Sequence, residues 1–114
     1  MNIENLTPHT LSLVTSDGQT IDLPPSGQVA RLAVTRTALP PITILDGVII
    51  TVSRPTLGEI TGLPPAQEGV ILIVSALVAE AANREDVFSP GELIRSPEGV
   101  VIGAKGLCSY KEGK

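Results

Sequence analysis

The side chains best suited to nucleophilic or acid–base chemistry are one histidine, His9, and one cysteine, Cys108, near opposite ends of a 114-residue chain. A hydrolase that uses histidine as a base also needs a nucleophile and a carboxylate that orients the ring. No local motif supplies either partner for His9, and no motif that would activate a thiol surrounds Cys108. The sequence therefore predicts a protein that is not an enzyme, with no catalytic residue.

The stretch NLTPH, residues 5–9, favours a turn as the role of His9. Pro8 restricts Thr7 to extended geometry. The side chains of Asn5, Thr7 and His9 are all of types that bond to the backbone of a turn. We therefore expect His9 to be a turn residue between two stretches of strand.

A metal or cofactor site is not predicted. One histidine and one cysteine fall short of the three or four ligands that a metal usually takes in proteins. The glycines Gly58, Gly62 and Gly69 do not lie between a strand and a helix start, as a phosphate-binding loop requires. We expect neither a metal nor a cofactor.

The charge and amino-acid composition of the chain indicate which classes of partner to expect. Twelve acidic and eight basic residues give a net charge of −4, the basic residues are scattered singly, and the chain has only two aromatic side chains, Phe88 and Tyr110. Nucleic-acid binders usually have a basic footprint and often aromatic stacking platforms, so a nucleic-acid polymer is not an expected partner. The polar start, the single cysteine and the lack of a long apolar run predict a cytoplasmic protein that contacts no membrane.

Hairpin signals dominate the chain. Three turn signals each lie between two apolar runs, the dipeptides Asp17-Gly18 and Asp46-Gly47 and the tetrapeptide SPEG at residues 96–99. Asp-Gly readily takes the backbone angles of a tight hairpin turn, and a proline presets the second position of a turn. We therefore expect three antiparallel hairpins, of which the one around Asp46-Gly47, between residues 42–45 and 48–53, has the strongest pattern.

Prolines, and side chains that alternate between two faces, mark the remaining extended segments. Proline pairs such as Pro40-Pro41 fall between apolar runs and predict loops or sheet edges, because proline cannot donate to a central ladder. Residues 29–35 alternate, with Ala30, Leu32 and Val34 on one side. This pattern predicts a half-buried strand with Arg31 on its wetter face.

One segment breaks the β pattern. The β-branched run at residues 70–74 is typical of a strand covered on both faces, and Ser75 then precedes the helix formers of residues 76–82. Ser75 is expected to cap the helix and Asn83 to end it in a left-handed conformation. Since the helix is apolar nearly all round, either the sheet and a loop or a second subunit must bury it.

These elements predict a mainly β (α+β) fold, with antiparallel hairpins that form a sheet, small barrel or sandwich and one short buried helix. Residues 1–114 are expected to form a single domain. The aliphatic helix and the low charge content also predict a homo-oligomer, because soluble monomers rarely expose contiguous apolar patches.

The start of the predicted helix is the one place with a physical reason to bind a small anion. Free backbone N–H groups near Ser75 and Ala76 attract phosphate. Arg31 and Arg54 are the arginines that we expect beside it, because a guanidinium binds phosphate bidentately. We also assign ligand contacts to two residues at the other end of the helix, Asn83 and Arg84. The alternative is that the isolated arginines, Arg95 among them, pair with surface acids.

Three stretches, NLTPH, LPPSGQVARL (residues 23–32) and GEITGLPPAQEGVILIVSALVAEAA (residues 58–82), resemble a family of small, largely uncharacterised bacterial and phage proteins. The resemblance covers most of the chain and implies no catalytic motif. In size, strand content and lack of catalytic residues, the chain is also similar to phage counter-defence sponges of the anti-Thoeris and anti-CBASS kind. Those oligomers sequester cyclic or nucleotide-derived immune signals without cleaving them.

We therefore predict non-catalytic sequestration of a small phosphate-bearing, nucleotide-derived signal, as in a phage counter-defence sponge acting in the host cytoplasm. Two other classes of function stay open. One is a protein-protein interaction or structural protein of a phage or bacterium that binds through a strand edge. The other is an enzyme in which His9 or Cys108 meets partners that are distant in sequence.

Overall fold

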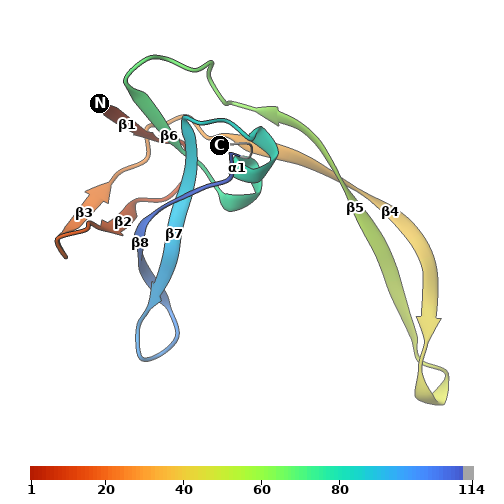
Figure 1. Ribbon diagram of the computed structural model, residues 1–114. Helices are drawn as coiled ribbons and strands as arrows, with labels where there is room; N and C mark the ends of the chain where they lie inside the picture. The colour runs from red at the N-terminus through yellow and green to blue at the C-terminus, as the bar shows by residue number, and fades with distance from the viewer. Residues whose placement is uncertain (112–114) are drawn as a thin grey trace.

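The computed structural model describes residues 1–111 as a body built on a six-stranded sheet, from which a long two-stranded ribbon projects (Figure 1). The sheet has the order β1-β6-β7-β8-β2-β3 and curls into a nearly closed, barrel-like body. Its strands are β1 (Asn2–Asn5), β2 (Leu11–Val14), β3 (Thr20–Leu23), β6 (Val70–Ile73), β7 (Val87–Arg95) and β8 (Val101–Ser109). The ribbon consists of β4 (Arg31–Thr43) and β5 (Ile49–Thr61), and the helix is α1 (Ala76–Ala82). The predicted mainly β class with one short helix is confirmed.

All three predicted hairpins are present and antiparallel: β2–β3, β4–β5 and β7–β8. The tip of the β4–β5 hairpin is a short 3-10 turn, Leu45–Gly47, in which Asp46 and Gly47 both have positive φ, 64° and 73°. Aspartate and glycine tolerate this left-handed region better than branched residues do, which is why this dipeptide is a strong turn signal.

The sheet is mixed, which the hairpin signals do not predict. β6 lies between β1 and β7 and is parallel to both, and β2 is parallel to β8. The chain passes from β6 to β7 through α1, since two parallel neighbours need a crossover and cannot be joined by a tight turn. The hairpins are thus local antiparallel units joined to one another by parallel pairings.

The hydrophobic core lies around β6. Leu72, Ile73 and Val74 are all buried, so both faces of this strand are covered, as predicted for the β-branched run. The main core cluster comprises Leu6, Ala30, Leu72, Val74, Val78, Ala79 and Val87. These aliphatic side chains come from β6 and the residue that follows it, from β7 and α1, and from the segments before β2 and β4, so the core ties the helix and the root of the ribbon to the sheet.

The helix begins and ends at the predicted residues. The Ser75 hydroxyl accepts a hydrogen bond from the Val78 backbone N–H at 3.4 Å, and Asn83 ends the helix with φ 50° and ψ 50°. Val78 is buried, whereas Leu77 is 45% exposed. The prediction of a buried helix therefore holds for its inner face. Among residues 1–111, neither sheet nor loop covers the outer face.

Removal of the helix cap gives a first testable prediction. Ser75→Ala is expected to lower the free energy of unfolding by about 1 kcal/mol, because the Val78 N–H loses its side-chain acceptor. Ser75→Gly is expected to cost only a few tenths of a kcal/mol, since glycine leaves the helix end open to water. Chemical denaturation measures both, and equal stabilities for Ser75→Ala and the wild type would contradict a capping role.

The ribbon, which we call the arm, makes the molecule elongated. Each of its strands has 13 residues, a length of about 40 Å. The radius of gyration is 17.9 Å and the longest axis 57 Å, whereas a compact chain of this length has a radius of gyration of about 13 Å. Figure 1 shows the arm leaving the body beside α1 and curving away from the sheet.

Pro40 and Pro41 lie inside β4, at a shift of register between Leu39 and Ile42, so they do not end the strand. A two-stranded ribbon has a free edge on each strand, and a proline at such an edge or at a bulge sacrifices no ladder bond. The two segments that we predict as separate strands, residues 29–35 and 42–45, are therefore largely one continuous strand. The half-buried pattern that we predict for the first of them holds only at its root.

The root of the arm is fixed to the body by packing and by hydrogen bonds. Leu32 and Ile60 face each other across the ribbon and pack against the core. The Gln28 side-chain amide donates to the Gly62 carbonyl at 2.8 Å, which ties together the segments that enter and leave the arm. Among residues 1–111, no helix is long and apolar enough to span a membrane.

Candidate functional site

Arg31 and Arg54, the arginines predicted to bind ligand, both lie on the arm. Arg31 stands opposite Thr61 at its root, and Arg54 stands opposite Thr37 further out. Because directly opposed residues share a face and alternate residues along a strand share a face, both arginines lie on the same face of the ribbon. Six residues of β4 separate their positions, about 20 Å. Both are exposed.

Neither arginine has a partner within residues 1–111, where the ion pair that forms is between Arg84 and Asp86. A third arginine of the arm, Arg36, lies on the opposite face, where its guanidinium donates to the Ser53 hydroxyl at 3.4 Å. We left open the alternative that the isolated arginines pair with surface acids. In the described part of the chain, Arg31 and Arg54 form no such pair.

Ser75 and Ala76, the predicted helix start, line a concavity of about 650 Å³ on the body. The concavity also contains Glu92 and Lys105, which stand opposite each other on β7 and β8 and leave it with no net charge. The Ser75 hydroxyl is engaged in the helix cap. Neither Arg31 nor Arg54 lines this concavity, so one chain does not bring the two halves of the predicted site together.

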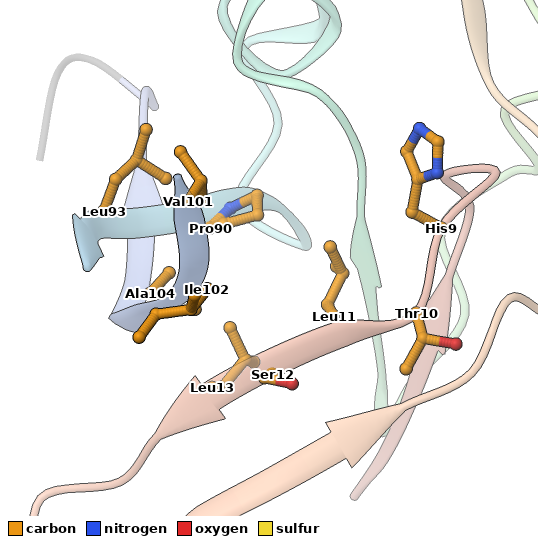
Figure 2. A pocket seen from close by; sticks show the side chains of 11 residues that line it. His9, Thr10, Leu11, Ser12, Leu13, Pro90, Leu93, Val101, Ile102 and Ala104 are labelled. Carbon is orange, nitrogen blue, oxygen red and sulfur yellow. The ribbon is translucent and has the colours of Figure 1, made fainter. Parts of the chain in front are cut away.

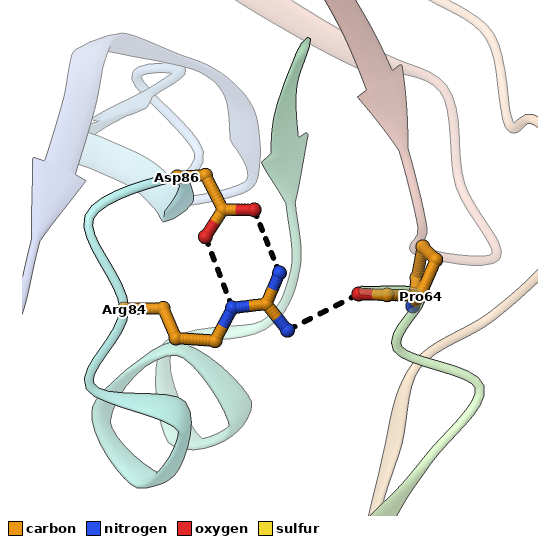
Figure 3. Close-up of polar contacts among 3 residues, drawn as sticks. All are labelled: Pro64, Arg84 and Asp86. Carbon is orange, nitrogen blue, oxygen red and sulfur yellow. Dashed lines mark hydrogen bonds and ion pairs between the residues drawn. The ribbon is translucent and has the colours of Figure 1, made fainter. Parts of the chain in front are cut away.

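Arg84 is held in a structural contact at the end of α1 (Figure 3). Its Nε and Nη2 donate to the two carboxylate oxygens of Asp86 at 3.0 and 2.7 Å, and its Nη1 donates to the Pro64 carbonyl at 3.1 Å. The bond to Pro64 connects the segment after the helix to the loop that follows β5. Asn83, beside it, occupies the left-handed cap position and is exposed.

The turn role predicted for NLTPH is carried by Asn5 and Thr7. The Asn5 amide donates to the carbonyls of His9 and Leu23, both at 2.8 Å, and its oxygen accepts from the Thr7 N–H at 2.9 Å and the Thr7 hydroxyl at 2.7 Å. His9 enters this network only through its backbone. Its side chain is exposed at the end of a groove (Figure 2).

The described residues form no assembled catalytic site that would support the enzyme hypothesis. His9 lines the groove, whereas Cys108 lines the concavity beside α1, so the two reactive side chains face different spaces. Within residues 1–111, no three His, Cys, Asp or Glu side chains are close enough to hold a metal ion. The pKa of Asp17 is lowered, chiefly because it accepts a hydrogen bond from the Thr15 hydroxyl and also one from the Gln19 N–H. This exposed carboxylate stabilises the β2–β3 turn.

Sequence reasoning missed two apolar surfaces. One is the groove, a cavity of about 320 Å³ between β2 and the β7–β8 hairpin, with a mainly apolar lining that Leu93, Val101 and Ile102 supply in part (Figure 2). The other is one face of the outer arm. The alternation of aliphatic with Thr and Ser residues in ITILDGVIITVS, residues 42–53, signals an amphipathic ribbon, but it does not reveal that this chain leaves the aliphatic side uncovered.

The sequence and the fold of this protein were both compared with known proteins. No protein family, no curated protein and no solved structure matches the chain. The features that bear on function are therefore the arm, the groove, and Arg31 and Arg54, whose side chains have no partner within residues 1–111.

Proposed function

We propose that this protein is a non-catalytic, homo-oligomeric binding protein that sequesters a small phosphate-bearing, nucleotide-derived molecule at sites formed where subunits meet. The single observation that carries the proposal is the pair Arg31 and Arg54 on one face of a projecting arm, because neither side chain has a partner within residues 1–111. Planar guanidinium groups suit phosphate, and they bind it bidentately.

The oligomer is needed because one chain does not complete a pocket around these arginines. They lie along a narrow ribbon that projects from the body, whereas the helix start at Ser75 and Ala76 lies in a concavity of the body. An arm that reaches a neighbouring subunit would bring guanidinium groups to a surface of that subunit. Partial desolvation in such an interface strengthens charge-assisted hydrogen bonds relative to those on an open surface.

The proposal is tested by ligand release. The protein is incubated with cyclic dinucleotides, cyclic trinucleotides and cyclic ADP-ribose isomers, separated from free ligand and denatured, and the supernatant is analysed by mass spectrometry. Wild type is expected to release an intact ligand. Arg31→Ala or Arg54→Ala is expected to weaken binding roughly tenfold to a hundredfold, the effect of losing a charge-assisted contact worth about 1.5–3 kcal/mol.

Arg36→Ala is the matched control, because it removes the same charge from the opposite face of the same arm. It should retain ligand. A released product that is cleaved would identify an enzyme. Release of none of these ligands by wild type would overturn the proposal.

A second candidate is an interaction protein that binds a partner through a strand edge, and the outer edge of β5 favours it. β5 pairs with β4 alone, and its residues Ile49–Arg54 contain no proline to block the addition of another strand. Ser53→Pro would interrupt this edge. Two results together would favour this function over sequestration. The Ser53→Pro variant would lose binding to the partner, and wild type would release no nucleotide ligand.

A further inference from the structure

The chain contains the dipeptide Asp-Gly twice, at Asp17-Gly18 in the β2–β3 turn and at Asp46-Gly47 at the tip of the arm. Asp-Gly is the aspartyl dipeptide most prone to cyclise, because glycine has no Cβ atom to hinder attack of its backbone nitrogen on the aspartate carboxyl carbon. The two copies have the same intrinsic chemistry. Any difference in their reactivity in the folded chain must therefore come from the structure around each one.

The carboxylate of Asp17 is held by its own turn. It accepts a hydrogen bond from the Thr15 hydroxyl and a second one from the Gln19 N–H at 3.4 Å. These bonds, the one from Thr15 above all, lower the pKa of Asp17. Because the protonated acid is the form that cyclises, a lowered pKa reduces the reactive fraction, and both bonds must also break before the carboxyl group can turn toward the backbone.

The carboxylate of Asp46 lacks these restraints. Ile44 stands two residues before Asp46, where the other turn has its threonine, and an aliphatic side chain has no donor. The Val48 N–H, two residues after Asp46, donates to the Leu45 carbonyl at 3.5 Å. Among residues 1–111, no hydrogen bond or ion pair reaches the Asp46 carboxylate. Residues 45–48 are all exposed, and Leu45 is 86% exposed.

Cyclisation at the tip requires the turn to open. Asp46 has φ 64° and ψ 23°, and at this ψ the Gly47 nitrogen is turned away from the Asp46 side chain, so the peptide must rotate before the nitrogen reaches Cγ. Beyond the last pair of β4 and β5, the Ile44 N–H bond to the Val48 carbonyl at 2.8 Å closes the tip. Figure 1 places the tip at the end of the arm farthest from the sheet. A turn at the free end of a ribbon opens at low cost.

We propose that Asp46 is a site of spontaneous isoaspartate formation in the folded protein, and that its own turn protects Asp17 from the same reaction. The Gly47 nitrogen attacks Cγ of Asp46 and forms a C–N bond, while the hydroxyl of the protonated carboxyl group and the amide hydrogen leave as one water. Water then adds to either carbonyl of the cyclic imide and breaks one of its two C–N bonds, which restores aspartate or gives isoaspartate. No enzyme, oxidant or reductant takes part.

The product alters the tip of the arm. In isoaspartate the Cβ atom becomes part of the main chain, so the loop gains one methylene group, and the former backbone carbonyl carbon becomes a free carboxylate. Turn geometry and loop length fix the register of a hairpin. The turn built on positive φ at Asp46 and Gly47 is therefore lost, and the pairing of β4 with β5 next to the tip must adjust. This inference concerns the arm alone and does not depend on the proposed function.

The test is the incorporation of heavy oxygen from solvent. The folded full chain is incubated for several weeks in water enriched in the heavy isotope, at neutral pH and physiological temperature, then digested and mapped by tandem mass spectrometry. Each passage through the imide leaves one solvent oxygen in the residue, whichever product forms. Asp46 is expected to acquire label at least roughly tenfold faster than Asp17, which corresponds to about 1.4 kcal/mol of additional barrier at Asp17.

Three variants assign the difference to its cause. Thr15→Val keeps the shape of the side chain but removes the hydroxyl, so labelling of Asp17 should accelerate severalfold while that of Asp46 stays unchanged. Ser16→Ala is the matched control, because it removes an exposed hydroxyl of the same turn that does not bond to the carboxylate, and it should change neither rate. Asp46→Glu should abolish labelling at the tip, since its ring would be one atom larger and closes far more slowly.

Equal labelling of the two aspartates in the folded chain, or faster labelling of Asp17, would overturn the inference. So would an unlabelled Asp46. In guanidinium chloride the two dipeptides should react at similar rates, and a difference that persisted in the unfolded chain would show that the turns do not cause it. A Thr15→Val protein in which Asp17 reacts as slowly as in the wild type would overturn the protective role of the turn.

Discussion

Asn5→Ala is expected to lower the free energy of unfolding by about 3 kcal/mol, because it removes four hydrogen bonds from a buried junction. The Asn5 side chain bonds to the Thr7 N–H and hydroxyl and to the carbonyls of His9 and Leu23. Asn5 and Thr7 are both buried, so water does not freely replace the lost partner. Chemical denaturation of the full chain measures the change.

Two variants define what this junction contributes. Asn2→Ala, at an exposed position of the same strand, should change the free energy of unfolding by less than about 0.5 kcal/mol. Asn5→Asp keeps an acceptor for Thr7 but places a carboxylate oxygen against the carbonyls of His9 and Leu23, so it should be destabilised at least as much as Asn5→Ala. If Asn5→Ala and Asn2→Ala were equally stable, the network would have no net energetic role.

Gly91→Ala is also expected to cost about 3 kcal/mol, for a steric reason. A Cβ atom at Gly91 would lie 2.2 Å from the Lys105 carbonyl oxygen and 3.1 Å from that of Gly106, both on the paired strand β8. Backbone atoms cannot give way without separating β7 from β8, and overpacking of this kind costs up to about 3 kcal/mol.

Gly58→Ala is the comparison for Gly91→Ala. Gly58 lies in β5, and a Cβ atom there would meet the Ala33 Cβ at 3.3 Å on the exposed arm. A small outward shift of the ribbon relieves that contact, so we expect a change of less than about 1 kcal/mol. Thermal unfolding of both variants gives the measurement, and a Gly91→Ala protein as stable as Gly58→Ala would show that β7 and β8 adapt freely.

The elements that sequence reasoning recovered are those with local causes. Asp46-Gly47 forms its turn because of its own backbone preferences, and Ser75 and Asn83 bound the helix through hydrogen bonds and angles within a few residues. The residues that determine these features are adjacent in the sequence, so a short window contains all the physical information. The short helix is predicted to the residue for this reason.

The features that escaped prediction depend on contacts between distant segments. The parallel pairing of β1 with β6 joins residues nearly 70 positions apart, and no local pattern records such a choice. Pro40-Pro41 is a strand breaker in a central ladder but is tolerated in the arm, whose strand edges are free. Whether an edge is free is a property of the whole sheet, so the pair could not be assigned from its neighbours.

The residues of the candidate site also divide into those that the local sequence predicts and those that depend on the folded structure. The sequence correctly marks Arg31 as exposed, but it does not reveal that Arg84 is already bound to Asp86, since this pairing depends on the conformation after the helix. The turn signal and β-branched residues at 42–53 predict a hairpin, but they do not predict where it lies relative to the body. Only the direction of the arm in space shows that it is left uncovered.

The narrow arm also has a consequence for hydrogen exchange. In a ribbon of two strands, only the amides that point to the partner strand are bonded, and the outer half of β4 and β5 has no third layer of side chains to hold it closed. Its amides should therefore exchange through local openings that require much less free energy than unfolding of the body. The arm forms a stability unit of its own, and its melting before the sheet would make unfolding of an isolated chain depart from two-state behaviour.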